Sequence, residues 1–540
     1  MIRVTCLGGA GGVTGSQYYL ETSRGKKLLV DCGMFQGGKL QEAKNFAPWG
    51  FSPKDIPTLI LTHAHVDHCG RIPKLVKDGF NGKILATAPT IDLCRILLLD
   101  SAHIQEMNAE WQTMKNRRQA KKPVPPLYTT ADAEHSLEHF SPVERDVVKE
   151  IEPGVRLRLR NAGHILGSCI AELWIDEGDE TVKIVFSGDL GKGDQLIVRD
   201  AQEIYNADYV FMESTYGDRF HRSFAESKVE LLECIEYAAK NKEKVLIPSF
   251  AVERTQEILY VLSEFYREGK LPDIPVYLDS PLAIKATDIF RKYRKEYDEA
   301  AQAIVSTGVD PFDLPNLKAT LTPAQSAAIN EKDGPAIVIA GNGMCTAGRI
   351  KFHLKYNLWR PGACLVFVGF QAAGSTGRKI IEGAKSVKIL REMVAVKARV
   401  STIGGFSAHA DQNDLLEWVG HFTECKPRIF LVHGETGAKE VLSEKITQQF
   451  GLSVHVPVAG ESLLLSPRDL KVEKPEQVAV EEESMDTMHN ELVDMENLLR
   501  QIKKELPERW SRVKDGDHGL ERLQFIHEEL RSLLNHENGA

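Results

Sequence analysis

Short runs of alternating apolar and polar residues, separated by glycine turns, fill the first 90 residues of the chain. Runs rich in β-branched residues with a period of two predict strands. From Thr90 the apolar residues recur at helical spacing past Glu106, which predicts a long helix. Strands are then expected again. The predicted strands of this region are residues 2–7, 17–21, 27–30, 58–62, 83–87, 155–159, 169–175, 182–187 and 209–213.

A regular alternation of helical and strand patterns begins after residue 220. Alternating helices and short apolar strands are typical of a parallel sheet covered by helices. The pattern therefore predicts an α/β unit inserted in the chain. Its expected elements are helices at 224–241 and 256–268 and strands at 245–248, 275–278, 336–340 and 364–369.

The last part of the chain differs in composition. Residues 401–466 return to strand, loop and helix signals and could complete the first domain. Beyond Lys471 an acidic linker leads to apolar residues that step by three and four, which describes the seam of a helix pair. We expect a helical arm that serves a homodimer or a partner protein, or else a two-helix cap on the body. The seam residues are Met485, Met488, Leu492, Met495, Leu499, Ile502 and Leu506.

Composition is that of a soluble, folded protein with more than one domain. The chain has 540 residues, of which 42% are hydrophobic and 26% charged. Nine cysteines occur singly, without a Cys-x-x-Cys pair, which argues against a disulfide framework and a thiolate zinc site. No apolar run reaches the roughly 18 residues that a membrane span needs. We expect a cytoplasmic protein that does not enter a membrane.

The net charge of −9 is unusual for a protein that binds a polyanion, since such proteins rely on Lys and Arg. Much of the excess is local. From Lys471 onward there are 10 basic and 17 acidic residues, a balance of −7, so the rest of the chain carries −2. A near-neutral body can still present a basic groove. Candidates to line it are Lys115, Arg117, Arg118, Lys121, Lys122, Arg219, His221, Arg254 and Lys379.

Four potential metal ligands lie within six residues directly after the apolar strand at 58–61. They are His63, His65, Asp67 and His68. On a loop, the spacing of the first two imidazoles turns them to one side, while Asp67 and His68 can hold a neighbouring ion. Imidazole and carboxylate suit Zn²⁺, with Mn²⁺ or Fe²⁺ as alternatives. Such density after a buried strand predicts a metal site.

This motif is the HxHxDH signature of the metallo-β-lactamase superfamily, and other residues resemble that superfamily in the same order. Asp31, His164 and Asp189 look like its structural aspartate, third histidine and bridging carboxylate. The resemblance implies two ions. One would be held by His63, His65, His164 and Asp189, and the other by Asp67, His68, Asp189 and a further histidine. Asp31 would accept a proton from a ligand imidazole and fix its ring.

Three later segments resemble motifs A, B and C of the β-CASP ribonucleases. They are Phe211–Gly217, Phe406–Asp411 and Leu431–Glu435. By that resemblance His433 completes the second metal site. Glu213 and His409 would pair near the leaving group, where an oriented imidazolium can donate a proton to the departing 3′ oxygen. Within that family, the motifs resemble those of bacterial and archaeal proteins similar to the cleavage and polyadenylation specificity factor endonuclease.

The resemblance implies an α/β fold, in which a metallo-β-lactamase αββα sandwich carries an inserted β-CASP α/β domain and a C-terminal helical extension. The expected domains are residues 1–210 for the first part of the sandwich, 211–400 for the β-CASP domain, 401–470 for the completion of the sandwich, and 471–540 for the acidic linker and arm.

The implied activity is hydrolysis of single-stranded RNA by a hydroxide that two Zn²⁺ ions share, leaving 5′-phosphate and 3′-hydroxyl ends. An endonuclease is expected, with 5′-exonuclease activity as another mode. Two alternatives stay open. A small-molecule thioesterase or lactonase on the same metal core would need neither the inserted domain nor the pair Glu213 and His409. A non-catalytic RNA-processing scaffold would have lost metal ligands, whereas every ligand position is present here.

Overall fold

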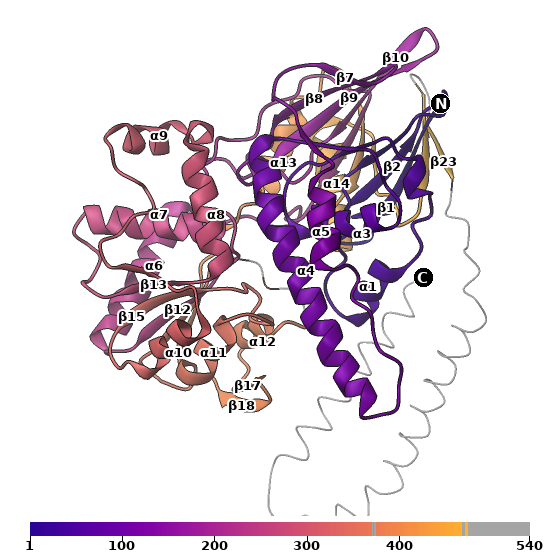
Figure 1. Ribbon diagram of the computed structural model, residues 1–540. Helices are drawn as coiled ribbons and strands as arrows, with labels where there is room; N and C mark the ends of the chain where they lie inside the picture. The colour runs from indigo at the N-terminus through magenta and orange to yellow at the C-terminus, as the bar shows by residue number, and fades with distance from the viewer. Residues whose placement is uncertain (370, 372–373, 467–469, 474–540) are drawn as a thin grey trace, which may run out of the picture. The chain divides into compact units, whose positions relative to one another are not determined.

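The computed structural model of the protein describes residues 1–369, 371, 374–466 and 470–473 (Figure 1). The helical arm that the sequence predicts from Met485 onward lies outside this described part. Of the acidic linker expected before it, residues 471–473 are described, and they belong to a strand. None of the helices in the described ranges combines the length and the apolar character that a bilayer crossing requires.

Two sheets form a sandwich. The first has eight strands in the order β23-β22-β1-β2-β3-β4-β5-β6 and the second seven in the order β21-β20-β11-β10-β9-β8-β7. The first sheet consists of β1 (Ile2–Gly8), β2 (Gln17–Glu21), β3 (Lys27–Val30), β4 (Thr58–Ile60), β5 (Lys83–Ala86), β6 (Phe140–Pro142), β22 (Ser462–Leu465) and β23 (Leu470–Glu473). The second consists of β7 (Lys149–Glu152), β8 (Val155–Asn161), β9 (Cys169–Glu177), β10 (Glu180–Phe186), β11 (Tyr209–Glu213), β20 (Arg428–Val432) and β21 (Val454–His455).

One hydrophobic core lies between the two sheets. In β1 every second residue is buried, so Ile2, Val4 and Cys6 face the same core as Val155 and Leu157 of β8. This period of two is what places one side of each strand inside the sandwich. The strands thus bury the alternating residues from which they were predicted.

Helices cover the outer faces of the sandwich. Leu29 and Leu59 of the first sheet share a core with Leu75 and Leu93 of its helices. Val210 of the second sheet packs with Leu415 and Leu442 of another helix pair. The first group is α2 (Val66–Cys69), α3 (Ile72–Lys77), α4 (Ala88–Arg117) and α5 (Thr130–Leu137), and the second is α13 (Gln412–Gly420) and α14 (Thr436–Phe450). Two packed sheets with helices on both outer faces confirm the predicted αββα sandwich. The predicted inserted α/β domain is described next.

The inserted domain contains a six-stranded sheet of order β14-β13-β15-β12-β16-β19, in which all pairings are parallel. All residues of β12 and β15 are buried, as expected for a parallel sheet with helices on both faces. Its strands are β12 (Lys244–Pro248), β13 (Val276–Asp279), β14 (Leu317–Ala319), β15 (Ala336–Ala340), β16 (Cys364–Phe367) and β19 (Arg399–Thr402). Its helices, which gather around this sheet in Figure 1, are α6 (Phe224–Lys240), α7 (Arg254–Arg267), α8 (Pro281–Lys292), α9 (Glu299–Ser306), α10 (Pro323–Glu331), α11 (Ile350–Asn357) and α12 (Thr376–Ile381).

The remaining elements are short. A hairpin is formed by β17 (Ser386–Ile389) and β18 (Glu392–Ala395). The others are α1 (Lys39–Ala43) and the 3-10 turns η1 (Lys44–Phe46), η2 (Pro53–Asp55), η3 (Arg294–Glu296) and η4 (Gly404–Phe406).

Two boundaries differ from the sequence expectation. The strand β11 pairs within the sandwich as far as Glu213, a few residues after the expected domain limit at 210/211. The strand β19 pairs within the inserted sheet as far as Thr402, which lies after the expected limit at 400/401. The helix α4 also extends to Arg117, well beyond Glu106, past which the apolar periodicity fades. Polar residues at its end hid this extension, because they break the apolar periodicity.

Candidate metal centre

The candidate ligands follow strand ends that meet at one edge of the sandwich. The parallel strands β3 and β4 lead to Asp31 and His63, and the parallel strands β10, β11 and β20 lead to Asp189, Glu213 and His433. The carboxyl ends of neighbouring parallel strands lie side by side, so loops from distant parts of the chain converge. Sheet topology therefore gathers the site.

Three histidines and an aspartate form a first cluster. The Nδ1 atom of His65 lies 3.2 Å from Nε2 of His63 and 3.1 Å from Nε2 of His164. The Oδ2 atom of Asp189 lies 3.4 Å from the same nitrogen of His63 and 3.5 Å from that of His164. Four donor atoms thus surround one point, and this group can hold one metal ion.

A second cluster combines Asp67, His68 and His433 with the other oxygen of Asp189. Oδ1 of Asp189 lies 3.3 Å from Nε2 of His68 and 3.4 Å from Nδ1 of His433. Oδ2 of Asp67 lies 3.5 Å from Nε2 of His433. Asp189 therefore presents one carboxylate oxygen to each cluster, which is the geometry of a bridging ligand.

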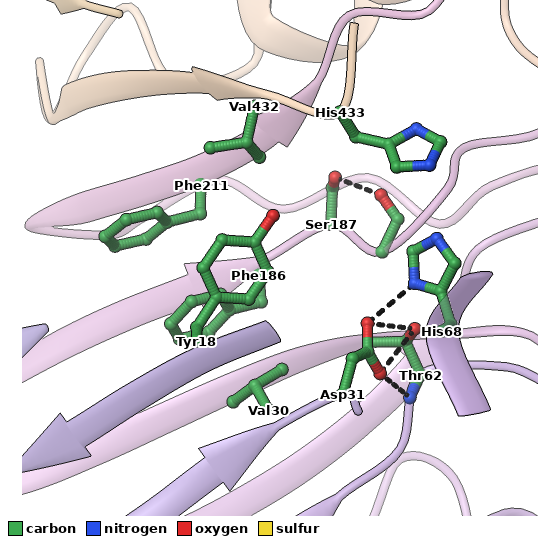
Figure 2. A pocket seen from close by; sticks show the side chains of 11 residues that line it. Tyr18, Val30, Asp31, Thr62, His68, Phe186, Ser187, Phe211, Val432 and His433 are labelled. Atoms are coloured by element: carbon green, nitrogen blue, oxygen red, sulfur yellow. Dashed lines mark hydrogen bonds and ion pairs between the residues drawn. The ribbon is translucent and has the colours of Figure 1, made fainter. Parts of the chain in front are cut away.

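Asp31 orients one ring of the second cluster. Its Oδ2 atom lies 2.7 Å from Nδ1 of His68 and accepts a hydrogen bond from it (Figure 2). The other ring nitrogen, Nε2, is left free to face Asp189. The backbone N–H of Thr62 donates to Oδ1 of Asp31 at 2.8 Å, and the Thr62 hydroxyl donates to both carboxylate oxygens. Such a carboxylate partner fixes the tautomer and orientation of a metal-binding histidine.

The backbone is strained at two of these positions. Asp31 has φ 59° and His433 has φ 48°, in the left-handed region that residues other than glycine rarely occupy. Each is held there by a neighbouring segment, since Asp31 N–H donates to the Ile60 carbonyl and His433 N–H to that of Gly9. Outliers of this kind cluster at functional sites, where the surrounding fold supports them.

The electrostatics of the first cluster suit a cation. Burial lowers the pKa of His63 to about 3 and that of His65 to about 4, and it also lowers the pKa of His164 well below the ordinary value. Neutral imidazole is the form that binds metals. The buried Oδ1 of Asp189 has no hydrogen-bond partner among the described residues. A cation is the partner that such an unpaired carboxylate oxygen fits.

The second cluster is more negative. Burial lowers the pKa of His68, but the charges of Asp189 and Asp31 outweigh it and raise this pKa well above the ordinary value. Burial raises the pKa of Asp67, yet its hydrogen bond and charge interactions with His433 and His68 lower it overall. A field that favours a positive histidine equally favours a divalent cation. The residues of both clusters therefore fit two metal ions.

A third group adjoins the metal cluster. Nδ1 of His409 lies 3.1 Å from Oε1 of Glu213 and 4.0 Å from Oδ2 of Asp189. Glu213 is itself fixed, because its carboxylate accepts the N–H groups of Leu190 and Thr215. Burial lowers the pKa of His409, but the nearby carboxylates, Glu213 first, raise it to about 9. This arrangement directs the free side of the ring away from Glu213.

An apolar wall closes the inner side of the site. Figure 2 shows Val30, Tyr18, Phe186, Phe211 and Val432 beside Asp31, His68 and His433. The ring centroids of Phe186 and Phe211 stack at 4.7 Å. These side chains belong to the core between the two sheets, so the ligands stand on a packed support.

The ten residues proposed from the sequence as ligands or catalytic groups all lie in these three connected groups. The candidate RNA contacts are more scattered. Arg254 is buried and forms an ion pair with Glu257. The backbone N–H of His221 donates to Asp411, and its ring Nε2 lies within hydrogen-bond distance of the His409 carbonyl. Lys115, Arg117, Arg118, Lys121 and Lys122 are exposed.

Several supporting residues were not singled out from the sequence. They include Thr62, and Thr215, whose hydroxyl lies 3.1 Å from Nδ1 of His433. Gln195 is another, because its amide and the His164 ring both reach the carbonyl of Ala408. Thr62 and Thr215 lie inside the motifs, so the motifs themselves were a signal. Nothing local marks Gln195.

Comparison with protein families accounts for most of the described chain. The family model of the metallo-beta-lactamase superfamily matches residues 10–249, that of the Beta-Casp domain matches residues 255–380, and that of the Zn-dependent metallo-hydrolase RNA specificity domain matches residues 393–457. The three matches follow one another along the sandwich, the inserted sheet and the returning segment.

Similar curated proteins cover much of the chain. Ribonuclease TTHA0252 of Thermus thermophilus is 40% identical over 435 residues, which are 80% of this chain and 93% of that protein. Transcription termination factor FttA of Methanocaldococcus jannaschii is 32% identical over 85% of this chain and 70% of its own length. The FttA of Thermococcus kodakarensis is 33% identical over 84% and 70%. The chain is therefore a metallo-hydrolase and belongs to the β-CASP family of the metallo-β-lactamase superfamily.

Proposed function

We propose that this protein is a metal-dependent ribonuclease that hydrolyses phosphodiester bonds in single-stranded RNA. It acts as an endonuclease with two Zn²⁺ ions and leaves 5′-phosphate and 3′-hydroxyl ends. The proposal is supported by the family's RNA specificity domain at residues 393–457 and by the ribonuclease among its relatives.

The observation that carries the proposal is the pair Glu213 and His409 beside the bridging carboxylate. The Nδ1–H of His409 faces Glu213 at 3.1 Å, and the ring lies 4.0 Å from Asp189. A ring oriented this way can deliver a proton from its other nitrogen to an oxygen that leaves phosphorus near Asp189. Hydrolysis of a thioester needs no such donor, because a thiolate leaves readily without a proton.

Two cations would be held by the clusters around Asp189. The first would use His63, His65 and His164, and the second Asp67, His68 and His433. When bound, two such ions lower the pKa of a shared water toward neutrality and offset the charge on the attacked phosphate. The protein's own residues hold the geometry, since Asp31 fixes His68 and Thr215 contacts His433.

The test is cleavage of single-stranded RNA labelled either internally or at the 5′ end, by protein whose zinc content is measured. We expect metal-dependent internal cuts with 5′-phosphate products, and cutting slower by about 10²-fold in His409→Ala while zinc stays bound. Cyclic phosphate ends would contradict water as the nucleophile. Turnover of thioesters or lactones without RNA cleavage would replace this function with small-molecule hydrolysis.

A role in ending transcription is a second candidate, favoured by relatives named transcription termination factor that are 32–33% identical over 84–85% of this chain. Cleavage of the nascent transcript would free its 5′ part from the polymerase. The measurement is release of RNA from stalled elongation complexes by the wild-type protein and by His65→Ala. Release that persists in the variant would separate termination from cleavage.

A further inference from the structure

Glu253, at the start of α7, has a backbone conformation that side-chain-bearing residues rarely adopt. Its φ is 65° and its ψ is −64°. The N–H of Arg254 donates to the carbonyl of Val252 at 2.9 Å, which closes a three-residue turn around Glu253. A turn of this type is strained and rare. It falls between the metallo-β-lactamase match, which ends at 249, and the Beta-Casp match, which begins at 255.

The strained turn directs its side chain into the loop that carries His164. Glu253 is 1% exposed, and its Oε2 atom accepts the backbone N–H of Leu166 at 2.9 Å. Leu166 lies two residues after His164 and is also buried. A buried backbone N–H without an acceptor is costly, so this carboxyl is a structural requirement of the loop in its present position.

The other supports of this loop come mainly from the sandwich. Ser168 Oγ accepts the N–H groups of His164 at 3.1 Å and Ile165 at 3.3 Å, and the Ala408 carbonyl faces Nδ1 of His164. Apolar packing also joins the two, because Ile165 and Leu166 belong to the same hydrophobic core as Val252. Among the polar contacts of the described residues, the inserted domain adds, besides Glu253, an indirect tie through Glu296 to Arg145 and from there to the Ser168 carbonyl. Glu253 is therefore the residue of the inserted domain that hydrogen-bonds directly to the ligand loop.

One oxygen of Glu253 remains to be explained. Oε1 is buried and has no hydrogen-bond partner among the residues that the structure describes. Burial and the neighbouring charge of Glu257 raise the pKa of Glu253 well above its ordinary value. A neutral carboxyl avoids the cost of a buried charge. The loop needs only the oxygen that accepts the Leu166 N–H, so the neutral amide of a Glu253→Gln variant should serve in place of the carboxyl.

We propose that Glu253 is a positioning residue through which the inserted domain fixes the His164 loop and sets the affinity of the cation held by His63, His65, His164 and Asp189. This inference rests on the proposed metal-dependent function. Glu253 contacts neither the cation ligands nor the reacting atoms. The strained turn aims the side chain at Leu166.

The experiment compares Glu253→Gly, Glu253→Ala and Glu253→Gln in the full chain, with Glu257→Gln as a matched control. Glu257 is a similarly buried carboxylate four residues later, in α7, but it pairs with Arg254 instead of reaching the loop. Zinc affinity is measured by competition with a chelator, and thermal stability is measured on the metal-free protein.

We expect Glu253→Gly and Glu253→Ala to weaken binding of the zinc ion in the first cluster by roughly 10–100-fold, as loss of an outer support of a ligand does. Glycine relieves the positive φ, so the Tm of metal-free Glu253→Gly should not fall below that of Glu253→Ala. Glu253→Gln should restore zinc affinity to near the wild-type value, since its amide oxygen still accepts from Leu166. Glu257→Gln should leave zinc affinity unchanged.

Unchanged zinc affinity in Glu253→Gly and Glu253→Ala, with a lowered Tm alone, would reduce Glu253 to a structural residue and overturn the inference while the ribonuclease proposal stands. A wild-type protein that neither binds zinc nor cuts RNA would overturn the proposed function, and this inference with it.

Discussion

The two metal clusters share Asp189 but are built differently. The first takes His63, His65 and His164 from segments that all precede the inserted domain, and burial keeps their imidazoles neutral. The second needs His433, which arrives only after the inserted domain, and includes the partly exposed Asp67. There the carboxylates of Asp189 and Asp31 raise the pKa of His68.

Because of this difference, we expect the two clusters to lose their cations in different ways. The first cluster consists of three buried, neutral imidazoles beside Asp189, so substitution of one histidine removes a ligand that no neighbouring group can replace. The second depends on charge and on the return of the chain after the insertion. We therefore expect the second cation to be the more easily removed, and chelator titration should show two steps of zinc loss.

The largest effect is expected for His65→Ala. Its Nδ1 is the atom within 3.2 Å of both other imidazole nitrogens in the first cluster. We expect RNA cleavage to fall by about 10³-fold or more, because removal of the cation removes several kcal/mol of transition-state stabilisation. The measurement is kcat/KM together with zinc per chain. The control is His135→Ala, at an exposed histidine. Near-normal cleavage by His65→Ala would contradict a role of the first cluster in the reaction.

A somewhat smaller loss is expected for His433→Ala. It should empty the second cluster and leave the first occupied, so bound zinc should fall from two ions to one. Cleavage should decrease by about 10²–10³-fold, because one cation still supplies part of the charge stabilisation. Elemental analysis of the purified variant checks this. Loss of both ions would mean that the two clusters cannot be filled independently.

His409→Ala should separate proton donation from metal binding. We expect a decrease of about 10²-fold in kcat, the low end of what an oriented acid contributes, with the zinc content unchanged. Glu213→Gln should act in the same direction, because it removes the charge that orients His409. A substrate with a leaving group that needs no proton should recover the difference. An equal defect on that substrate would exclude the acid role.

Asp31→Asn should affect the second cluster only. The amide can no longer serve as a charged acceptor for Nδ1–H of His68, so zinc affinity there should weaken by roughly 10–100-fold. Zinc competition measures it, with affinity of the first cluster as the internal reference. Weakening of the first cluster by the same factor would show that Asp31 acts on the whole site.

The smallest effect is expected for Thr215→Val. It removes a hydroxyl that lies 3.1 Å from Nδ1 of His433 without changing side-chain size. A neutral hydrogen bond contributes about 1 kcal/mol net, so the second zinc ion should bind about fivefold more weakly. The same titration resolves this change. A loss as large as that of His433→Ala would indicate a collapsed loop.

Local patterns predicted much of the fold and most of the site. His63, His65, Asp67 and His68 follow a buried strand within six residues, and Asp31, His164 and Asp189 also follow predicted strands. The resemblance to known motifs supplied their order. The strand order of the inserted sheet, with β19 beside β16, was beyond reach, because it depends on contacts between distant segments.

The supports of the site were also beyond reach. Glu253 and Gln195 act through the carbonyls and N–H groups of remote loops, and such contacts leave no pattern in a single sequence. Short strands with exposed residues, such as β7, were missed because they lack an alternating apolar side. Sequence therefore marks the chemistry better than what holds it in place.

We propose that Asp189 bridges two cations. Crystals grown with zinc, measured at the zinc absorption edge, test it directly. We expect two anomalous peaks roughly 3.5–4 Å apart, one among His63, His65 and His164 and the other among Asp67, His68 and His433. A single peak under saturating zinc, or peaks that leave Asp189 uncoordinated, would contradict it.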